Sequence, residues 1–283
     1  MKYFLDTEFL EGTQKKWFGQ TKLTIDLISI GIVAEDSREY YAISKDFNLK
    51  EAWNRYDLVR DGFKDFELTP NYKKVYWIRE NVLKPIFIEL RAKEVEEYNI
   101  AQRRNVVLDF PTYSFCFREF KRLINKYGKT NKQIAEEIVQ FIDARWVEEG
   151  NISKGFMYPG GTSIKEVKTS NVQFYGYYCD YDWVVFCWLF GRMIDLPKGF
   201  PMYCIDLKQL LDDKVSNMEF RKQKSGDVND YEIVKGSTNL QQFLDLVKGE
   251  GLVNGTYPKQ TNEHNALADA RWNRQLYNFL NTL

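Results

Sequence analysis

Three short segments of this 283-residue chain place acidic residues beside apolar ones. The first contains Asp6 and Glu8, the second Asp180 and Asp182, and the third Asp269. A carboxylate held against apolar structure is costly unless it finds a partner, and no Lys or Arg is adjacent in sequence to any of the five. Hard divalent cations such as Mg²⁺ prefer oxygen ligands, so the pattern predicts a divalent-metal site.

The spacing of Asp6 and Glu8 predicts that both side chains lie on one face of a strand, because successive strand side chains alternate. A second D-x-E, at Asp65 and Glu67, lies in a charged stretch that we interpret as solvated surface. The tripeptide alone is therefore a weak signal. A strand end with incidental acids remains the alternative reading of the first pair.

The third segment combines His264 with Asp269. Five helical residues separate two side chains by about 140°, so the pair cannot share a helical face. Asn265 is a good N-cap, which would place His264 on the entering loop and Asp269 one turn inside, both within reach of one point. His264 is the only histidine in the chain, so it is the candidate for a general base that titrates near neutrality; a surface loop histidine is the alternative.

The elements that would position these residues begin with an antiparallel meander. We predict strands at residues 3–6, 25–34 and 38–44, with a polar loop at 11–24. Apolar residues recur at helical spacing between about 46 and 150, which predicts a helical insertion. Later elements are predicted as a loop at 155–161, a strand at 172–179, helices at 182–192, 206–213 and 239–247, a polar loop at 225–236 and a last helix at 265–280. Strands followed by covering helices are typical of a layered α/β or α+β domain, and we expect one domain over 1–283.

Composition narrows the class of protein. The chain is 44% hydrophobic, which is enough for a core, and its 40 Lys and Arg balance its 40 Asp and Glu, so there is no overall basic field to attract nucleic acid. No apolar stretch approaches the roughly 18 residues of a membrane span. Four cysteines without a CxxC pair argue against structural zinc, and with no signal peptide they indicate reduced thiols in a cytoplasmic protein.

The three acidic segments, in this order, resemble the Exo I, II and III motifs of the DEDDh 3′-to-5′ exonucleases. Leu5–Phe9 (LDTEF) resembles Exo I, Tyr181–Phe186 (YDWVVF) resembles Exo II, and His264–Ala270 (HNALADA) resembles Exo III. A closer similarity is to the small mycobacterial-type exoribonucleases of the RNase T superfamily. That similarity extends over roughly half of the chain. It is carried by residues 3–9, 25–44, 77–83, 181–191 and the Exo III helix, whereas 11–24 and much of 48–75 and 84–128 look additional.

This resemblance implies an RNase H-like mixed sheet flanked by helices. It also implies a two-metal site, with two Mg²⁺ or Mn²⁺ ions about 4 Å apart. Asp6, Glu8, Asp182 and Asp269 would hold the ions, with Asp6 between them, and His264 would be the base. The family pattern has an aromatic residue before the Exo II aspartate, which selects Asp182. Asp180 would then cap the helix or add a nearby charge, and it remains the alternative ligand.

The expected substrate is the 3′ end of RNA, with 5′-mononucleotides as products. RNA is favoured by the resemblance, and a 2′-hydroxyl beside Thr7 and Phe9 could donate to Glu8 or accept from the backbone. Phe9, Trp17 and Phe18 are candidates for stacking on terminal bases, with ordinary packing as the alternative. Candidates for phosphate contacts are Arg103, Arg104, Arg221, Lys222 and Lys224. The resemblance also allows for a homodimer.

Three alternatives compete with an exoribonuclease. A DNA exonuclease would use the same chemistry on another substrate. A binding module would use the metal site only to grip a nucleic-acid 3′ end, although binding alone needs no base. An ordinary α/β protein with surface acids would explain each motif singly, but not their order.

Overall fold

The protein is described here by a computed structural model. It covers residues 1–15, 21–63, 70–104, 106, 114–148, 172–217, 219–223, 231–235 and 257–282. The predicted loop at 155–161, the predicted helix at 239–247 and the second D-x-E lie outside these residues.

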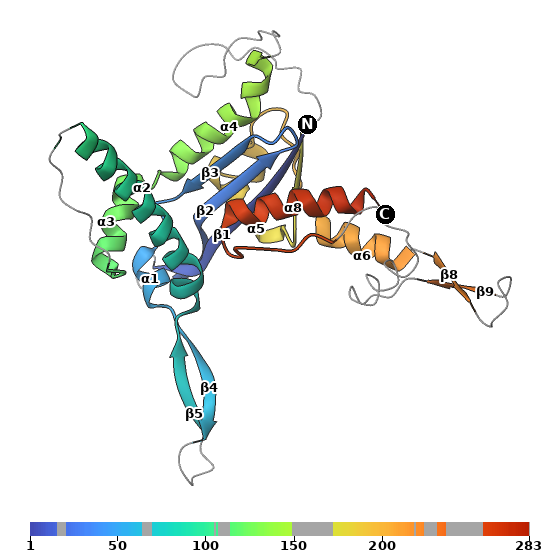
Figure 1. The fold of residues 1–283 in the computed structure, drawn as a ribbon, viewed down its shortest axis with the longest axis horizontal. Coiled ribbons are helices and arrows are strands. Elements are labelled where there is room, and N and C mark those ends of the chain that lie inside the picture. The colour runs from blue at the N-terminus through green and yellow to red at the C-terminus, as the bar shows by residue number, and fades with distance from the viewer. Residues whose placement is uncertain are drawn as a thin grey trace.

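A five-stranded mixed sheet forms the centre of the fold, in the order β3-β2-β1-β6-β7 (Figure 1). Its strands are β1 (Lys2–Lys15), β2 (Thr21–Ala34), β3 (Glu39–Ile43), β6 (Gln173–Gly176) and β7 (Ile205–Asp206). The first three strands pair antiparallel, as the sequence predicts, while β6 and β7 continue the sheet in parallel. The expected α/β class with a mixed central sheet is confirmed, and the architecture is compatible with an RNase H-like fold.

The hairpin of β1 and β2 is longer than predicted. Its register pairs Glu11 with Ile25 and Lys15 with Thr21, so the prediction of a loop over residues 11–24 is wrong for most of that range. Glu11 and Leu23 are exposed, so this outer part needs no buried face. Backbone pairing therefore maintains the ladder without the apolar alternation by which a half-buried strand is recognised.

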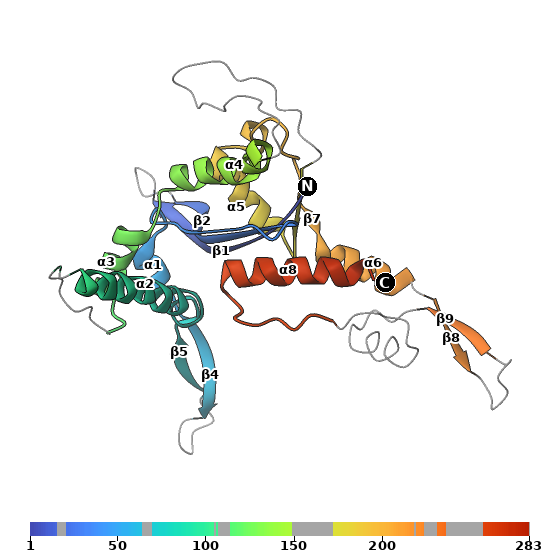
Figure 2. The same ribbon diagram turned by 45° about the horizontal axis from the view of Figure 1, so that its top comes forward.

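Helices cover both faces of the sheet (Figure 2). On one face α4 (Asn131–Glu148) and α5 (Asp180–Phe190) pack over Tyr3, Leu5 and Phe174. On the other face α6 (Leu207–Asn217) and α8 (Ala266–Leu280) enclose a core that contains Phe4, Val33 and Tyr175. Alternation along β1 sends Tyr3 and Leu5 to the first core and Phe4 to the second, which sets the direction of the side chains of this strand as far as Glu8.

Helices from the range of the predicted insertion form a third core at the far end of the β1–β2 hairpin, around Leu10, Ile28 and Ile43. The helices of this core are α1 (Leu49–Asn54), a π-helical turn η2 (Arg79–Leu83), α2 (Lys84–Arg103) and α3 (Phe117–Tyr127). The last helix of that range, α4, packs against the central sheet instead, and the insertion itself stays a prediction. The helical character of this region is confirmed, with one exception. The strands β4 (Asp57–Phe63) and β5 (Pro70–Val75) form a hairpin that projects from the body (Figure 1).

A second small hairpin consists of β8 (Glu219–Gln223) and β9 (Tyr231–Lys235). The prediction of a polar loop through residues 225–236 is therefore wrong for β9. Both missed hairpins are two-stranded ribbons outside the central sheet, and their sequences lack the strong alternation of a half-buried strand. No helix of the described residues is long and apolar enough to cross a membrane. All four cysteines are free thiols.

Candidate metal centre

Asp6 and Glu8 lie on the α8 side of the central strand β1. They follow Phe4 at every second residue, and Phe4 belongs to the core beneath α6 and α8. The predicted common face is therefore present, and a register shift between Glu8 and Phe9 ends the regular alternation just beyond it. Neither acid has an ion-pair partner among the described Lys and Arg side chains.

Gly31 allows α8 to approach these acids. It lies opposite Asp6 in the β1–β2 ladder, and a Cβ atom at this position would fall 2.3 Å from the backbone oxygen of Ala266. Any side chain here would push the start of α8 away from the sheet. Asn273 secures the same approach from further along the helix, since its Nδ2 donates to the Leu5 carbonyl oxygen at 2.9 Å. Sequence reasoning did not single out either residue.

Asp269 is placed by the start of α8. Asn265 is the N-cap, as predicted, and its Oδ1 accepts from the backbone N–H of Ala268 at 3.0 Å. The two oxygens of Asp269 accept from the backbone N–H of His264 at 2.9 Å and from Gln260 Nε2 at 2.7 Å. These bonds aim the buried carboxylate at the sheet.

Asp6, Glu8 and Asp269 converge. One carboxylate oxygen from each lies within 4.8 Å of the others, which is a spacing that a single cation can bridge. Burial, together with the charge of the neighbouring acids, raises the pKa of Asp6 well above its usual value and raises that of Glu8 to about 8. Burial also raises the pKa of Asp269, against the bonds from Gln260 and His264. When all three acids are ionised, the cluster therefore holds more negative charge than the described residues neutralise.

Asp182 stands beside this cluster and is bound to β1. Its Oδ1 accepts from the backbone N–H of Thr7 at 2.8 Å and from the Thr7 hydroxyl at 2.6 Å. The pairing of β1 with β6 ends at Phe4, so β6 does not bind the backbone N–H of Thr7. This N–H is therefore free to donate to Asp182, which lies at the start of α5, the helix that follows β6. Burial raises the pKa of Asp182 to about 6 despite the Thr7 bonds. Its charge in turn raises the pKa values of Asp6 and Glu8.

The two Exo II aspartates have different surroundings. Asp182 is buried, whereas Asp180 is exposed and is the first residue of α5. The helix cap is Cys179, so the expectation that Asp180 caps the helix is wrong. Thr7 is also reassigned. It is buried and gives both of its donors to Asp182, so it positions that acid, while its contact with a substrate sugar stays a prediction.

His264 lies on the loop that enters α8, as predicted. Its backbone adopts a left-handed conformation with φ of 65°, and this geometry turns its N–H toward Asp269. The imidazole packs edge-on against the indole of Trp77, with ring centroids 4.7 Å apart. Trp77 was not singled out as a site residue, although it opens the 77–83 segment that carries the family resemblance.

The candidates for substrate contact are only partly described. Phe9 is half-buried and packs against the ring of exposed Tyr181 at 5.8 Å between centroids. Trp17, Phe18 and Lys224 lie outside the described residues, as do the side chains of Arg221 and Lys222. Arg103 and Arg104 lie at the C-terminal end of α2.

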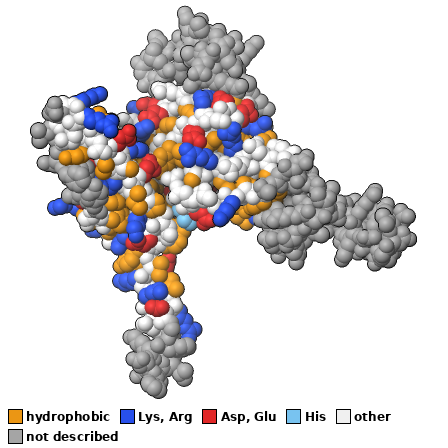
Figure 3. Space-filling model, in the orientation of Figure 1, with side chains coloured by type: hydrophobic (Ala, Val, Ile, Leu, Met, Phe, Trp, Pro, Cys, Tyr) orange, Lys and Arg blue, Asp and Glu red, His pale blue; other side chains and the backbone are white. Residues whose placement is uncertain are grey.

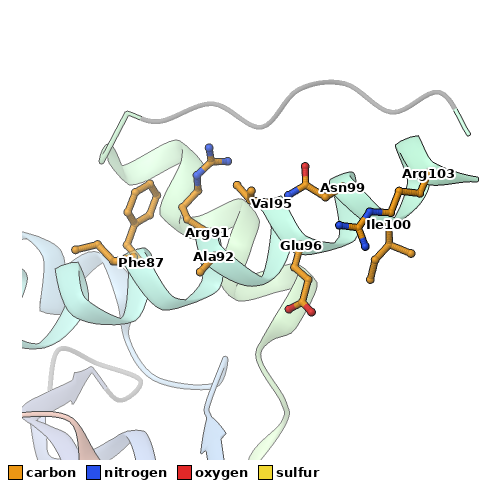
Figure 4. A pocket seen from close by; sticks show the side chains of 9 residues that line it. Phe87, Arg91, Ala92, Val95, Glu96, Asn99, Ile100 and Arg103 are labelled. Atoms are coloured by element: carbon orange, nitrogen blue, oxygen red, sulfur yellow. The ribbon is translucent and has the colours of Figure 1, made fainter. Parts of the chain in front are cut away.

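A cavity of about 790 Å³ is separate from the acidic cluster. Its lining side chains come from successive turns of α2, among them Phe87, Val95, Ile100 and Arg103 (Figure 4). None of the carboxylates from β1, α5 or α8 lines it. Its size therefore does not mark it as the chemical site.

The fold and this centre together define a mixed α/β protein with a carboxylate cluster at its central strand. No known protein-family model matches the sequence. The chain is 52% identical over 52 residues to proteins from two strains of Mycobacterium tuberculosis, each named a 3′-5′ exoribonuclease. The match spans 18% of this chain and about a quarter of the length of each relative.

Proposed function

We propose that this protein is a metal-dependent 3′-to-5′ exonuclease that acts on RNA. The observation that carries the proposal is the convergence of Asp6, Glu8 and Asp269 without a Lys or Arg partner among the described residues, with Asp182 beside them. Raised pKa values at carboxylates are typical of sites that await a cation or a proton. The partial similarity to two proteins named 3′-5′ exoribonucleases supports the reaction class.

The donor set fits hard divalent cations. All four acids offer oxygen, and the only histidine is placed as a neighbour, so Mg²⁺ or Mn²⁺ suits the site better than zinc. Asp6, Glu8 and Asp269 would hold one ion, and Asp182 would join in holding a second. When bound, such ions activate water and neutralise charge that develops on phosphate.

Other residues of this chain would transfer the proton and position the acids. His264 would take the proton of the attacking water on a ring nitrogen, and the edge-on Trp77 ring would keep the imidazole facing the site. The bond from the His264 N–H to Asp269 joins the base to the acid cluster, so the loop cannot move without disturbing both. Thr7 and Gln260 fix Asp182 and Asp269, respectively.

RNA is proposed over DNA on two grounds. The matched relatives are named exoribonucleases. In addition, we expect the terminal sugar to lie beside the acid cluster, where a 2′-hydroxyl would donate to Glu8. A hydrogen bond to a charged group contributes about 1.5–3 kcal/mol, or roughly 10- to 150-fold in preference.

The test is incubation with Mn²⁺ or Mg²⁺ and 5′-labelled oligonucleotides, RNA and DNA of matched sequence. We expect a ladder of products shortened from the 3′ end, release of 5′-mononucleotides and faster loss of RNA. A 3′-phosphate adds about two negative charges where carboxylates already crowd, and it should block degradation. Cleavage of a circular single strand would identify an endonuclease, and equal efficiency on DNA would remove the RNA preference.

A further inference from the structure

The projecting hairpin of β4 and β5 has two chemically different faces. Leu58 pairs with Lys74 and Arg60 pairs with Tyr72, and directly paired residues of an antiparallel ladder share a face. The ring of Tyr56 packs against that of Tyr76 at 5.9 Å, which extends the same face to the base of the hairpin. We call this set the arm face, and its members are Tyr56, Leu58, Arg60, Tyr72, Lys74 and Tyr76.

The two described acids of the hairpin, Asp57 and Asp61, lie on the opposite side. Asp57 pairs with Val75 and Val59 pairs with Lys73, and Asp61 forms an ion pair with Lys73 at 3.4 Å. Within residues 56–61 and 71–76, no carboxylate lies on the arm face. The two faces therefore separate charge. One carries cations among aromatic rings, and the other carries both aspartates beside a lysine.

Large side chains on the arm face are open to solvent. Leu58 is 61% exposed, Tyr72 is 55% exposed and Tyr56 is 43% exposed. Figure 3 shows hydrophobic, basic and a few acidic side chains along this projection. Lys74 Nζ lies 4.1 Å from the centre of the Tyr56 ring. Such mixtures of stacking platforms and cations are typical of surfaces that track single-stranded nucleic acid.

The base of the arm is fixed and adjoins the metal centre. The guanidinium of Arg79 stacks 3.9 Å from the centre of the Tyr76 ring, and Arg79 Nε donates to the Trp53 carbonyl oxygen at 2.7 Å. The next residue after Tyr76 is Trp77, whose ring touches that of His264. Tyr76, at the base of the arm face, is therefore followed directly by the residue that contacts the candidate catalytic loop.

We propose that the arm face binds the single-stranded nucleic acid that leads into the metal centre, with bases on its tyrosines and phosphates on its cations. This inference rests on the proposed function for the identity of the ligand. A second copy of this chain fits less well, because two such faces would bring Arg60 and Lys74 against their own equivalents. A polyanion with exposed aromatic bases complements both features of the face.

Binding is tested in the full chain carrying Asp6→Asn, so that the labelled RNA survives the titration. The probe is a single-stranded oligoribonucleotide of about 20 nucleotides, longer than the roughly 4–16 nucleotides that one binding module covers. We expect Tyr72→Ala to weaken binding roughly tenfold and Tyr72→Phe to retain it, because stacking needs only the ring.

Lys74→Gln and Lys73→Gln form a matched pair, since they make the same change at adjacent exposed positions on opposite faces. We expect Lys74→Gln to reduce the slope of log affinity against log salt by about 0.7, the value for one phosphate on a single strand. Lys73→Gln should leave the slope unchanged. Equal effects of the two changes, or affinities for Tyr72→Ala and Lys74→Gln equal to that of the parent, would overturn the proposal.

Kinetic measurements on proteins that retain Asp6 distinguish the role of the arm from that of the metal centre. Tyr72→Ala and Lys74→Gln should raise KM on the long oligonucleotide and leave kcat, and the hydrolysis of a dinucleotide, unaltered. An unmutated protein that binds RNA through the arm but hydrolyses nothing would refute the proposed function alone. Hydrolysis with arm-independent binding would refute the arm alone. A Tyr72→Ala protein that changes from dimer to monomer in sedimentation, with unaltered RNA binding, would identify the arm face as a contact between copies.

Discussion

Two acidic clusters in this protein have opposite electrostatic surroundings. Glu94, on α2, accepts from Arg122 at 2.6 and 2.8 Å and from Arg91 at 3.0 Å, and these bonds, led by those from Arg122, lower its pKa to about 2. The cluster of Asp6 and Glu8 has neighbouring acids where Glu94 has cations, and its pKa values are raised.

The opposite pKa shifts distinguish Glu94, which has structural partners, from Asp6 and Glu8, for which we propose a cation as the partner. Glu94 forms ion pairs with Arg91 on the same helix and with Arg122 on α3, so its charge is compensated and the pairs join α2 to α3. Among the described residues no Lys or Arg neutralises Asp6 or Glu8, so their burial is compensated by protons or by cations from solution, at a cost to the stability of the folded chain. The following predictions test this contrast, beginning with the largest expected effect.

Neutralising any of the four acids at the candidate metal centre should abolish hydrolysis. We expect Asp6→Asn, Glu8→Gln, Asp182→Asn and Asp269→Asn each to reduce turnover by at least about 1000-fold without unfolding the chain, since in the proposed function the acids hold metal ions and do not form the core. Oligonucleotide cleavage and circular dichroism measure the two effects. Glu94→Gln is the control and should keep its kcat. Normal turnover in two of the four variants would remove the site assignment, and activity lost in Asp180→Asn but kept in Asp182→Asn would reverse the choice between those two.

His264→Ala should lower kcat by roughly 100-fold, because it removes the proposed base and leaves the oxygen donors in place. Calorimetric titration with Mn²⁺ should show cation affinity close to that of the unmutated protein. Lost affinity in the variant would instead make His264 a ligand.

Divalent cations should raise the melting temperature, and more so at alkaline pH. The raised pKa of Glu8 means that its contribution to the stability of the cation-free protein is present below about pH 4.5 and is lost as the pH rises through about 8. Cations need the deprotonated acid, so they restore most stability where it has been lost. At 100 times its dissociation constant a cation adds about 2.7 kcal/mol. Scanning calorimetry at about pH 6 and about pH 9, with and without Mn²⁺, measures the effect, which should be much reduced in Asp6→Asn.

Glu94→Gln should have the smallest effect and the opposite pH dependence. Because the pKa of Glu94 is lowered, its stabilisation is present above about pH 4.5 and is lost as the pH falls through about 2. Arg122 is 42% exposed, so solvent screens the pair and the expected loss is only about 1–2 kcal/mol. Urea unfolding of both proteins at neutral pH and near pH 2 should show the difference shrinking in acid. A constant difference would exclude an electrostatic origin.

The sequence by itself determined the local positions of several candidate site residues. The alternation of Asp6 and Glu8 on a strand, the N-cap at Asn265 and the loop position of His264 all follow from local rules, and the structure has each of them. The antiparallel start of the sheet and the helical region after it were also predictable, because β-branched runs and helical spacing are strong local signals.

Only the tertiary structure decided how these parts meet. The approach of α8 to β1 depends on the missing side chain of Gly31, and the orientation of Asp182 depends on an N–H that β6 leaves unpaired. The contact of Trp77 with His264 joins residues 187 positions apart in the chain, and no local pattern signals it. The projecting hairpin was missed because strands with no buried side carry no apolar alternation. Its separated faces become visible only once the register between β4 and β5 is known.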